Sequence, residues 1–366
     1  MKIINKIKKR PFLYGCIGIV LLVIIIWSRD MPYPVQLNQQ ETAQVDQFLT
    51  DMQTRCVGRY LVDLPASYQA GHDTFSAFIN DNPIKTRMLY PPSFEQKIRL
   101  RKERLNATKT EDPQDMPYLK KVYKLPYGMK GVIFERNESE GVEDSARVLE
   151  AHLYVGMTAV EVEMKADDGS ARRYDADRKQ YPEMYGNNVP QKLAELIDLL
   201  SRMQARAETD IPTAPGLCIP NLFIKDGRKK QKENILVLYE SKITPATSIS
   251  FDSNNFIKEK DTLLERINGI TVYALLNQIN NTNFRKGKRN IIGMNSAEEW
   301  LSEADHSERK KYREREFVMN VNETTGSSIS PYLTVNMTPD INFSESVAIG
   351  IWDKITDTLR YRPNAF

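Results

Sequence analysis

The sequence repeats itself once, and this duplication restricts its folds more than any other feature does. Cys56 begins the segment CVGRYLVDLP, and Cys218 begins the segment CIPNLFIKDG, at an offset of 162 residues (218 − 56). The same offset relates residues 94–106 to residues 256–268, with matching Phe, Glu, Arg and Asn residues. Two separated matches at one offset indicate a duplicated domain.

Each copy is predicted to open with a short strand and to continue into a helix. The opening strands are expected at Arg59–Leu64 and Leu222–Lys225. The helix of the first copy is expected to begin after Ser93, because serine is a good N-cap. Asn255 stands at the equivalent position of the second copy. The phenylalanines that follow these two caps are therefore predicted to take equivalent core positions.

Later in each copy, a strand of alternating apolar and polar residues is followed by an amphipathic helix. Apolar and polar residues alternate in 160–164 and in 333–337, which is typical of strands with one packed and one wet face. Apolar residues line one face of the predicted closing helices, 190–203 and 348–359. The predicted fold class is α+β, with two similar domains from an internal duplication. Each domain is expected to have a mainly antiparallel sheet with two helices on one face.

The predicted domain boundaries follow from the repeat. The first α+β repeat domain is placed at residues 50–205 and the second at residues 216–366. Residues 206–215, RAETDIPTAP, form the predicted linker because they are polar and contain proline.

An apolar run near the N-terminus predicts one transmembrane anchor at residues 12–28, after a basic cytoplasmic tail at residues 1–11. The run has about the length needed to cross a hydrocarbon core of about 30 Å. The basic flank should stay in the cytoplasm, which places the soluble region in the periplasm beside the inner membrane. A polar stalk is expected at residues 29–49. A cleaved signal peptide and a lipid-modified Cys16 are the alternatives, but no small-x-small cleavage site follows the run.

No catalytic, cofactor or metal motif is present in the sequence. The three histidines lie far apart, and the glycine-rich phosphate loops and serine elbow motifs are missing. The net charge is +3 and falls to −2 (3 − 5) without the five basic residues of the tail, so it does not indicate nucleic-acid binding. The basic runs Arg228–Lys232 and Arg285–Arg289 are interpreted as solvated loops or as contacts to an acidic partner surface. We therefore predict a binding protein without a small-molecule substrate, and no enzyme.

Three segments carry a resemblance to a known family. They are Thr54–Pro65 (TRCVGRYLVDLP), Ser93–Asn106 and Ala214–Asn221 (APGLCIPN), and they fall in a two-copy layout. From about residue 54 to residue 360, the chain resembles the immunity proteins that neutralise type VI secretion lipase effectors. The resemblance is specifically to the group paired with phospholipase effector class 4.

The resemblance implies a function and a mode of binding. It implies that the chain binds a cognate lipase effector and grips the lid region between its two domains, so that substrate cannot reach the serine nucleophile. It implies no cofactor and identifies no partner-binding residue. An envelope assembly or scaffold protein is the alternative function, and an envelope enzyme, with Cys56 or Cys218 as nucleophile, is a weaker one.

Cys56 and Cys218 are a candidate disulfide. They are the only cysteines beyond the predicted anchor, and thiols tend to pair outside the cytoplasm. Equivalent positions in two copies can also meet near a pseudo-two-fold axis. Two separate buried thiols are the alternative.

Overall fold

The computed structural model describes residues 31–267, 280–294, 296–305 and 313–366. The predicted anchor at residues 12–28 lies outside these residues. Across the described ranges, none of the helices combines the length and the apolar character that a membrane crossing requires.

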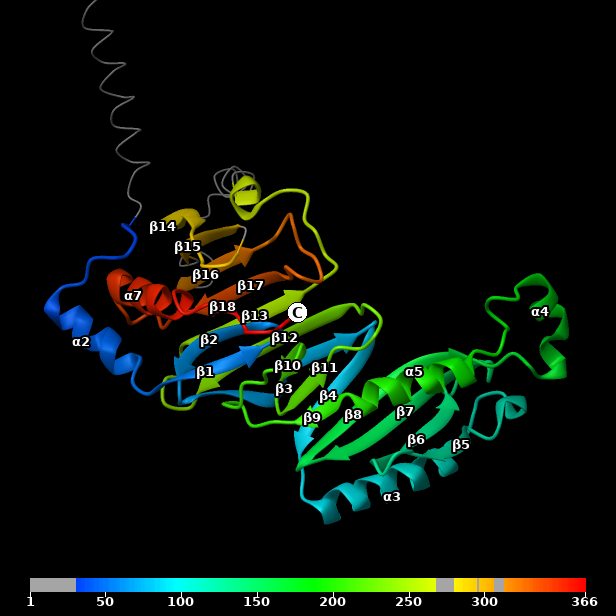
Figure 1. Ribbon diagram of the computed structural model, residues 1–366. Coiled ribbons are helices and arrows are strands. Elements are labelled where there is room, and N and C mark those ends of the chain that lie inside the picture. Colours follow the sequence, from blue (N-terminus) through cyan, green and yellow to red (C-terminus); the bar gives the residue numbers. More distant parts are fainter. Residues whose placement is uncertain (1–30, 268–279, 295, 306–312) are drawn as a thin grey trace, which may run out of the picture.

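One antiparallel sheet of twelve strands runs through both halves of the chain (Figure 1). The first half contributes β3 (Tyr68–Ile79), β4 (Asn82–Met88), β5 (Leu119–Lys124), β6 (Lys130–Asn137), β7 (Ala146–Val155) and β8 (Thr158–Asp167). The second half contributes β12 (Glu233–Ser241), β13 (Ser248–Asn254), β14 (Asn280–Arg289), β15 (Ala297–Asp305), β16 (Arg313–Val321) and β17 (Tyr332–Thr338). The strand order is β14-β15-β16-β17-β13-β12-β3-β4-β8-β7-β6-β5, so the two halves mirror each other.

The central pair β3–β12 joins the halves, which corrects the expectation of one sheet for each domain. The two strands are antiparallel, with Phe75 opposite Val237 and Ile79 opposite Glu233. A strand at a sheet edge exposes unpaired backbone groups, and pairing two such edges with each other satisfies both. The repeated units therefore share one continuous sheet.

In the first half, two helices cover opposite faces of the sheet. The side chains of β6 alternate: Val132 and Phe134 cluster with Leu105 of α3 (Pro91–Ala107), and Ile133 lies in the main core with Leu196 of α5 (Val189–Ser201). Successive side chains of a strand point to opposite faces. The prediction of helices on one face is therefore wrong for this half.

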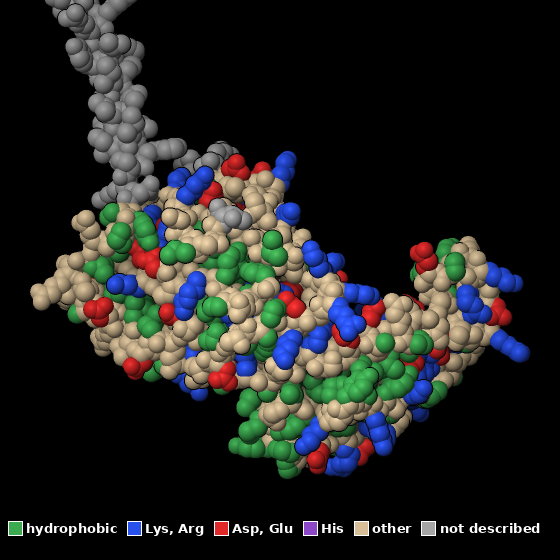
Figure 2. Space-filling model, viewed as in Figure 1, with side chains coloured by type: hydrophobic (Ala, Val, Ile, Leu, Met, Phe, Trp, Pro, Cys, Tyr) green, Lys and Arg blue, Asp and Glu red, His purple; other side chains and the backbone are tan. Residues whose placement is uncertain are grey.

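The first half ends in a projecting segment. It contains η3 (Arg172–Tyr174) and α4 (Asp175–Gln180), and η2 (Pro113–Asp115) lies near its base. Figure 2 shows a hollow between this projection and the second half, with Lys and Arg side chains gathered where the two halves meet.

In the second half, α7 (Glu345–Thr356) is almost completely buried, and α2 (Gln39–Phe48) packs against it. A Cβ added at Gly350 would meet methyl groups of Leu37 and Val45 at 3.1 Å, so the helices approach closely where α7 has no side chain. Residues 31–48 were expected to belong to a polar stalk. The structure corrects this, because Asn38 caps α2 with a capping box and Val45 is buried.

The helix that follows β4 in the first half and the helical residues that follow β13 in the second half begin differently. α3 starts at Pro91, with Tyr90 as its N-cap and two prolines in the first turn, so Ser93 is not the cap. Phe94 is buried, whereas Phe256 is 42% exposed and lies before the helical residues 263–267. The predicted equivalence of these two phenylalanines is wrong. Leu105 and Ile267, at the same offset, are both buried in helices.

Candidate functional site

Two cysteine-containing hairpins meet where the halves join. The first consists of β1 (Met52–Val57) and β2 (Tyr60–Pro65), and the second consists of β10 (Gly216–Ile219) and β11 (Leu222–Lys225). β18 (Arg360–Tyr361) extends the first hairpin, and β9 (Met203–Ala205) extends the second. Gly58 and Cys218 exchange two backbone hydrogen bonds of 2.8 Å, which link the hairpins directly. Gly58 adopts a positive φ of 56° in the first turn, which glycine permits at little cost.

Arg59, the next residue of that turn, connects the first half to the second. Its Nε and Nη2 donate to Glu233 at 2.9 and 2.6 Å, and its two Nη atoms donate to Asp226 at 3.1 and 2.7 Å. Nη1 also donates to the carbonyl of Ala365. Burial alone would lower the pKa of Arg59, but its hydrogen bonds to Glu233 and Asp226 outweigh burial and raise that pKa. Arg59 therefore stays charged and holds both carboxylates in place.

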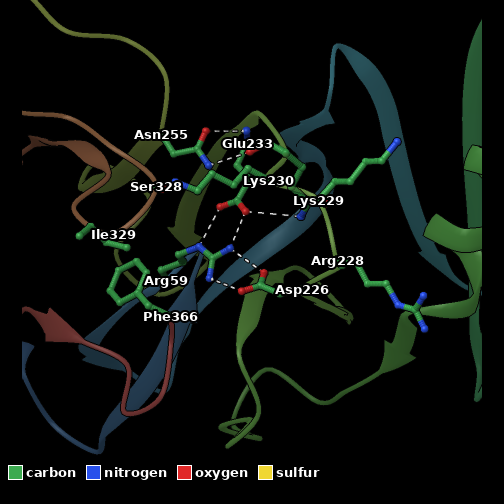
Figure 3. Close-up of a pocket in the computed structure, with 12 residues that line it drawn as sticks. Arg59, Asp226, Arg228, Lys229, Lys230, Glu233, Asn255, Ser328, Ile329 and Phe366 are labelled. Atoms are coloured by element: carbon green, nitrogen blue, oxygen red, sulfur yellow. Dashed lines mark hydrogen bonds and ion pairs between the residues drawn. The ribbon is translucent and has the colours of Figure 1, made fainter.

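A pocket of about 190 Å³ lies over this arginine (Figure 3). Twelve residues line it, and most of them belong to the loop between β11 and β12 or to the segment near Ser328. The cations of the loop, Arg228, Lys229 and Lys230, are exposed. Ile329 forms an apolar wall with 69% of its surface exposed, next to the Phe366 ring that contacts the Arg59 guanidinium. The site combines excess positive charge with an apolar wall.

The loop that carries the cations is held at both ends. Arg202, just after α5, donates from Nη1 to the Lys225 carbonyl at 2.6 Å and from Nη2 to Gln231 at 3.3 Å. Asn255 donates to the Gln231 carbonyl at 3.0 Å and accepts from the Glu233 amide at 2.9 Å. These bonds fix the loop between α5 of the first half and the sheet of the second half.

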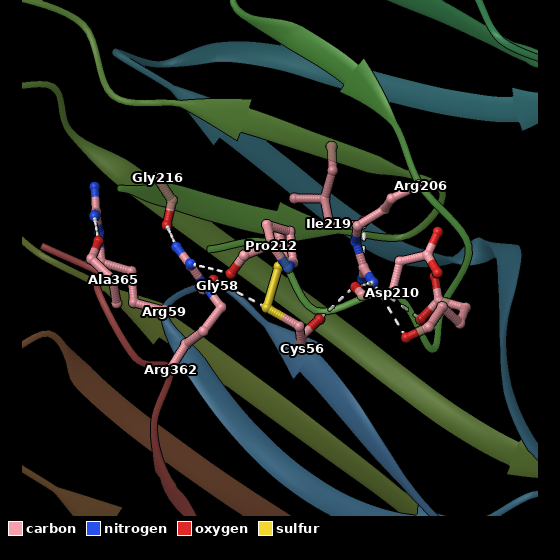
Figure 4. Close-up of a disulfide and its surroundings, with 12 residues drawn as sticks. Cys56, Gly58, Arg59, Arg206, Asp210, Pro212, Gly216, Ile219, Arg362 and Ala365 are labelled. Carbon is pink, nitrogen blue, oxygen red and sulfur yellow. Dashed lines mark hydrogen bonds and ion pairs between the residues drawn. A yellow bond between two sulfur atoms is a disulfide. The ribbon is translucent and has the colours of Figure 1, made fainter. Parts of the chain in front are cut away.

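Cys56 and Cys218 are joined by a disulfide, with their Cα atoms 5.7 Å apart (Figure 4). The structure thus brings together the two residues that the sequence indicated as a candidate disulfide. The bond lies in a small buried cluster with Leu61 and Phe223. It connects the same positions of the two hairpins, and it fixes how the halves sit at the junction.

Two buried arginines hold the predicted linker, residues 206–215, against the hairpins. Arg206 donates to the Cys56 carbonyl at 3.0 Å and to carbonyls of the linker itself. Arg362 donates to the carbonyls of Pro212, Ala214 and Gly216 at 2.6–2.9 Å (Figure 4). Burial and the nearby Arg59 lower the pKa of Arg362 to about 10. The linker is therefore a fixed part of the junction.

The two basic runs of the sequence have different environments. Arg228–Lys232 lies in an exposed loop, as predicted, although Lys232 lies 3.6 Å from Asp81. Arg285–Arg289 lies in β14, so its assignment to a loop is wrong. Arg285 and Arg289 are buried and bind Glu299 and Asp353, which removes them as surface contacts.

The described histidine side chain belongs to a structural network. His152 is buried in β7, and its Nε2 lies 2.8 Å from Glu150, which also accepts from Arg101 and Arg136. In the ranges that the structure covers, there is no cluster of His, Cys, Asp and Glu suited to hold a metal ion. His306 lies outside the described residues.

Comparison with protein families identifies the family of this chain. The family model "Tle cognate immunity protein 4 N-terminal domain" matches residues 53–206, and the model "Tle cognate immunity protein 4 C-terminal domain" matches residues 210–364. The chain belongs to the Tle cognate immunity protein 4 family. This is a family of immunity proteins, which act by binding an effector and not by catalysis. The predicted resemblance is confirmed.

Two solved structures share the fold of this chain. The apo immunity protein TplEi of the type VI secretion system from Pseudomonas aeruginosa is 22% identical, with a TM-score of 0.68. The match covers 87% of this chain and 99% of that chain. A chain of the Tle4–Tli4 complex is 21% identical, with a TM-score of 0.67, over 86% of this chain and 99% of that chain. No curated protein matches the chain.

The residues that build the junction were not singled out from the sequence. Arg59, Asp226 and Glu233 are polar, and more than 160 residues separate the arginine from its partners. One signal was available, because Arg59 interrupts the apolar segment CVGRYLV next to a repeated cysteine. A charged residue at such a place needs a buried partner.

Proposed function

We propose that this immunity protein neutralises a type VI secretion phospholipase effector by covering its lid, so that substrate cannot reach the active site. The observation that carries the proposal is the match of two consecutive family models to both halves of the chain. The solved Tle4–Tli4 complex supports it, since it contains a relative with the same fold bound to an effector.

A fixed junction suits inhibition by occlusion. The two halves share a sheet, a disulfide and the contacts of Arg59, so little conformational freedom remains to be lost on binding. Reducing that loss improves affinity without any additional contact. The hollow between the second half and the α4 projection offers a concave surface with parts of both halves (Figure 2).

The place of action that we propose is the periplasmic face of the inner membrane. The apolar run at residues 12–28 and the basic tail before it support an uncleaved anchor with this orientation. A disulfide is also compatible with an oxidising compartment. Membrane fractionation followed by N-terminal sequencing of the mature chain tests this location. An N-terminus near residue 28 or later would overturn the anchor.

Co-expression with the lipase tests the function. A periplasm-directed lipase effector from the same gene cluster is expressed with the soluble region (residues 30–366), with residues 30–205, with residues 216–366 or with an empty vector. We expect survival only with the complete soluble region, since both halves contribute to the concave surface. A purified assay should show that this region lowers lipid hydrolysis in proportion to the complex formed. Cell death with every version, together with undiminished hydrolysis, would exclude the immunity function.

A further inference from the structure

We infer that the pocket over Arg59 is the docking point for an acidic segment of the lipase effector that carries a large apolar side chain next to a carboxylate. This inference rests on the proposed function and specifies the part of the partner that the junction recognises. It follows from the charges of the pocket, its apolar wall and the restraint of its loop.

The cations of the pocket loop, unlike Arg59, are not paired with a carboxylate in the part of the chain that the structure describes, although Lys229 helps to lower the pKa of Glu195. Within the described residues, the side chains of Arg228, Lys229 and Lys230 make no ion pair and no hydrogen bond. The carboxylates of Asp226 and Glu233, in contrast, are both bound by Arg59. Three cations therefore remain to attract the carboxylates of a partner. Arg228 and Lys229 extend away from Arg59, so they form the rim of the pocket (Figure 3).

The apolar wall indicates a protein side chain as the second part of the ligand. Ile329 projects 69% of its surface to solvent beside the half-buried Ser328, and both line the pocket. The volume of about 190 Å³ is suited to one large side chain. An apolar group placed in such a recess, with charge pairs around it, is the arrangement found at energetic centres of protein interfaces.

Two features favour a peptide over a membrane surface or a nucleic acid. The carboxylates of Asp226 and Glu233 lie in the pocket itself and would repel any anion that entered it, so the recess suits an apolar side chain, with the carboxylates of the partner at the rim. The loop is also fixed by Arg202 and Asn255, so its cations keep a defined arrangement and do not form a free basic tail. A segment with spaced carboxylates and one apolar side chain fits both the rim and the wall.

Charge reversal at the rim tests the docking point. The full soluble region with Lys229→Glu and Lys230→Glu is compared with a matched control, Lys102→Glu and Lys109→Glu, which changes the same charge at exposed lysines of α3 and the residues after it. Binding to the purified lipase effector is measured by surface plasmon resonance at low and high salt. At low salt, we expect the rim pair to weaken affinity by about thirtyfold, because reversed charges slow association and repel the partner. The loss should be smaller at high salt. The control pair should change affinity by less than about threefold.

Two further probes identify what the pocket binds. An array of overlapping peptides from the lipase sequence should show binding at acidic segments with an aromatic or aliphatic residue, and Ile329→Asn should weaken it by about tenfold. Phosphatidylglycerol vesicles should bind wild type and the rim variant equally. Equal losses in the rim and control pairs, or loss of vesicle binding with unchanged lipase affinity, would overturn the docking point.

The outcomes separate the two proposals. If the wild-type chain binds the lipase and the rim variant binds it equally well, the docking point is wrong and the immunity function stands. If the wild-type chain does not bind the lipase at all, the proposed function fails and the docking point fails with it. Unfolding midpoints of all variants should agree, since every substituted side chain is exposed.

Discussion

Arg59 of the first half meets Glu233 of the second half through two parallel hydrogen bonds, of 2.9 Å from Nε and 2.6 Å from Nη2. Both side chains are about 5–6% exposed, and 174 residues separate them in the sequence. A bidentate pair fixes direction as well as distance. This contact therefore sets the angle between the first hairpin and the sheet of the second half, beneath the pocket.

Removal of the arginine should destabilise the protein. Arg59→Ala leaves Glu233 buried without its partner, and we expect a loss of about 3–5 kcal/mol in the free energy of unfolding. Arg59→Lys should recover only part of it, because an ammonium group cannot reproduce the bidentate contact. Urea denaturation of the soluble region measures both, with the exposed Lys165→Ala as control. A loss below about 1 kcal/mol for Arg59→Ala would show that the contact does not hold the junction.

Removal of the disulfide should lower the free energy of unfolding by a measurable amount, but by less than the loop length suggests. The bond closes a loop of 162 residues, for which the chain-entropy model gives about 5 kcal/mol as an upper figure. Cys56→Ala with Cys218→Ala retains the two backbone hydrogen bonds between Gly58 and Cys218, so we expect a loss of about 2–4 kcal/mol. Thermal unfolding with and without reductant measures it. Reductant should lower the melting temperature of wild type and leave that of the double variant unchanged.

The sequence predicted the parts of the fold that depend on local pattern. The strands at 160–164 and 333–337 and the closing helices α5 and α7 are present, because each buries one face and exposes another. The pairing of β3 with β12 could not be predicted, since it depends on which edges of the two units meet. The same reason explains the error at Arg285 and Arg289. Their partner Glu299 lies 14 and 10 residues away in the neighbouring strand, so the charge pattern of β14 alone resembles an exposed segment.

Acid should weaken the first half through Asp144. Burial alone would raise the pKa of this carboxyl, but hydrogen bonds from Lys120, Arg173 and Tyr174 outweigh it and lower the pKa to about 2. A carboxylate with a lowered pKa in the folded state contributes stability above its unfolded value of about 3.9, and that stability is lost as the pH falls toward 2. Asp144→Asn should therefore reduce stability at pH 7 and flatten the dependence between pH 4 and 2.

Unfolding by urea at a series of pH values measures the effect of Asp144. The exposed Asp46→Asn is a suitable control, because its side chain makes no hydrogen bond within the described residues. Parallel pH profiles of stability for wild type and Asp144→Asn would show that Asp144 is not the source of the acid sensitivity.

Helix α2 should detach from α7 when a charge is placed between them. Val45 is 1% exposed and packs where α7 carries Gly350, so an aspartate at position 45 would bury a carboxylate among apolar groups. The helix is also held through Tyr33, whose ring lies 3.9 Å below the Arg289 guanidinium and whose hydroxyl donates to Asp357. These contacts precede α2 and do not depend on Val45. Val45→Asp should therefore release residues 39–48 while residues 31–35 stay bound.

Hydrogen exchange resolves these two segments. In Val45→Asp, amides of residues 39–48 should exchange at least about a hundredfold faster, since release of the helix removes their protection. The amide of Met31, which donates to the Phe284 carbonyl at 2.7 Å, should keep its wild-type rate. Gln44→Asp places the same charge one residue earlier on the exposed side of α2 and should leave both segments unchanged. Faster exchange of both segments in Val45→Asp would mean that α2 and the Tyr33 contacts release together, and unchanged exchange at residues 39–48 would mean that Val45 does not hold α2 on the second half.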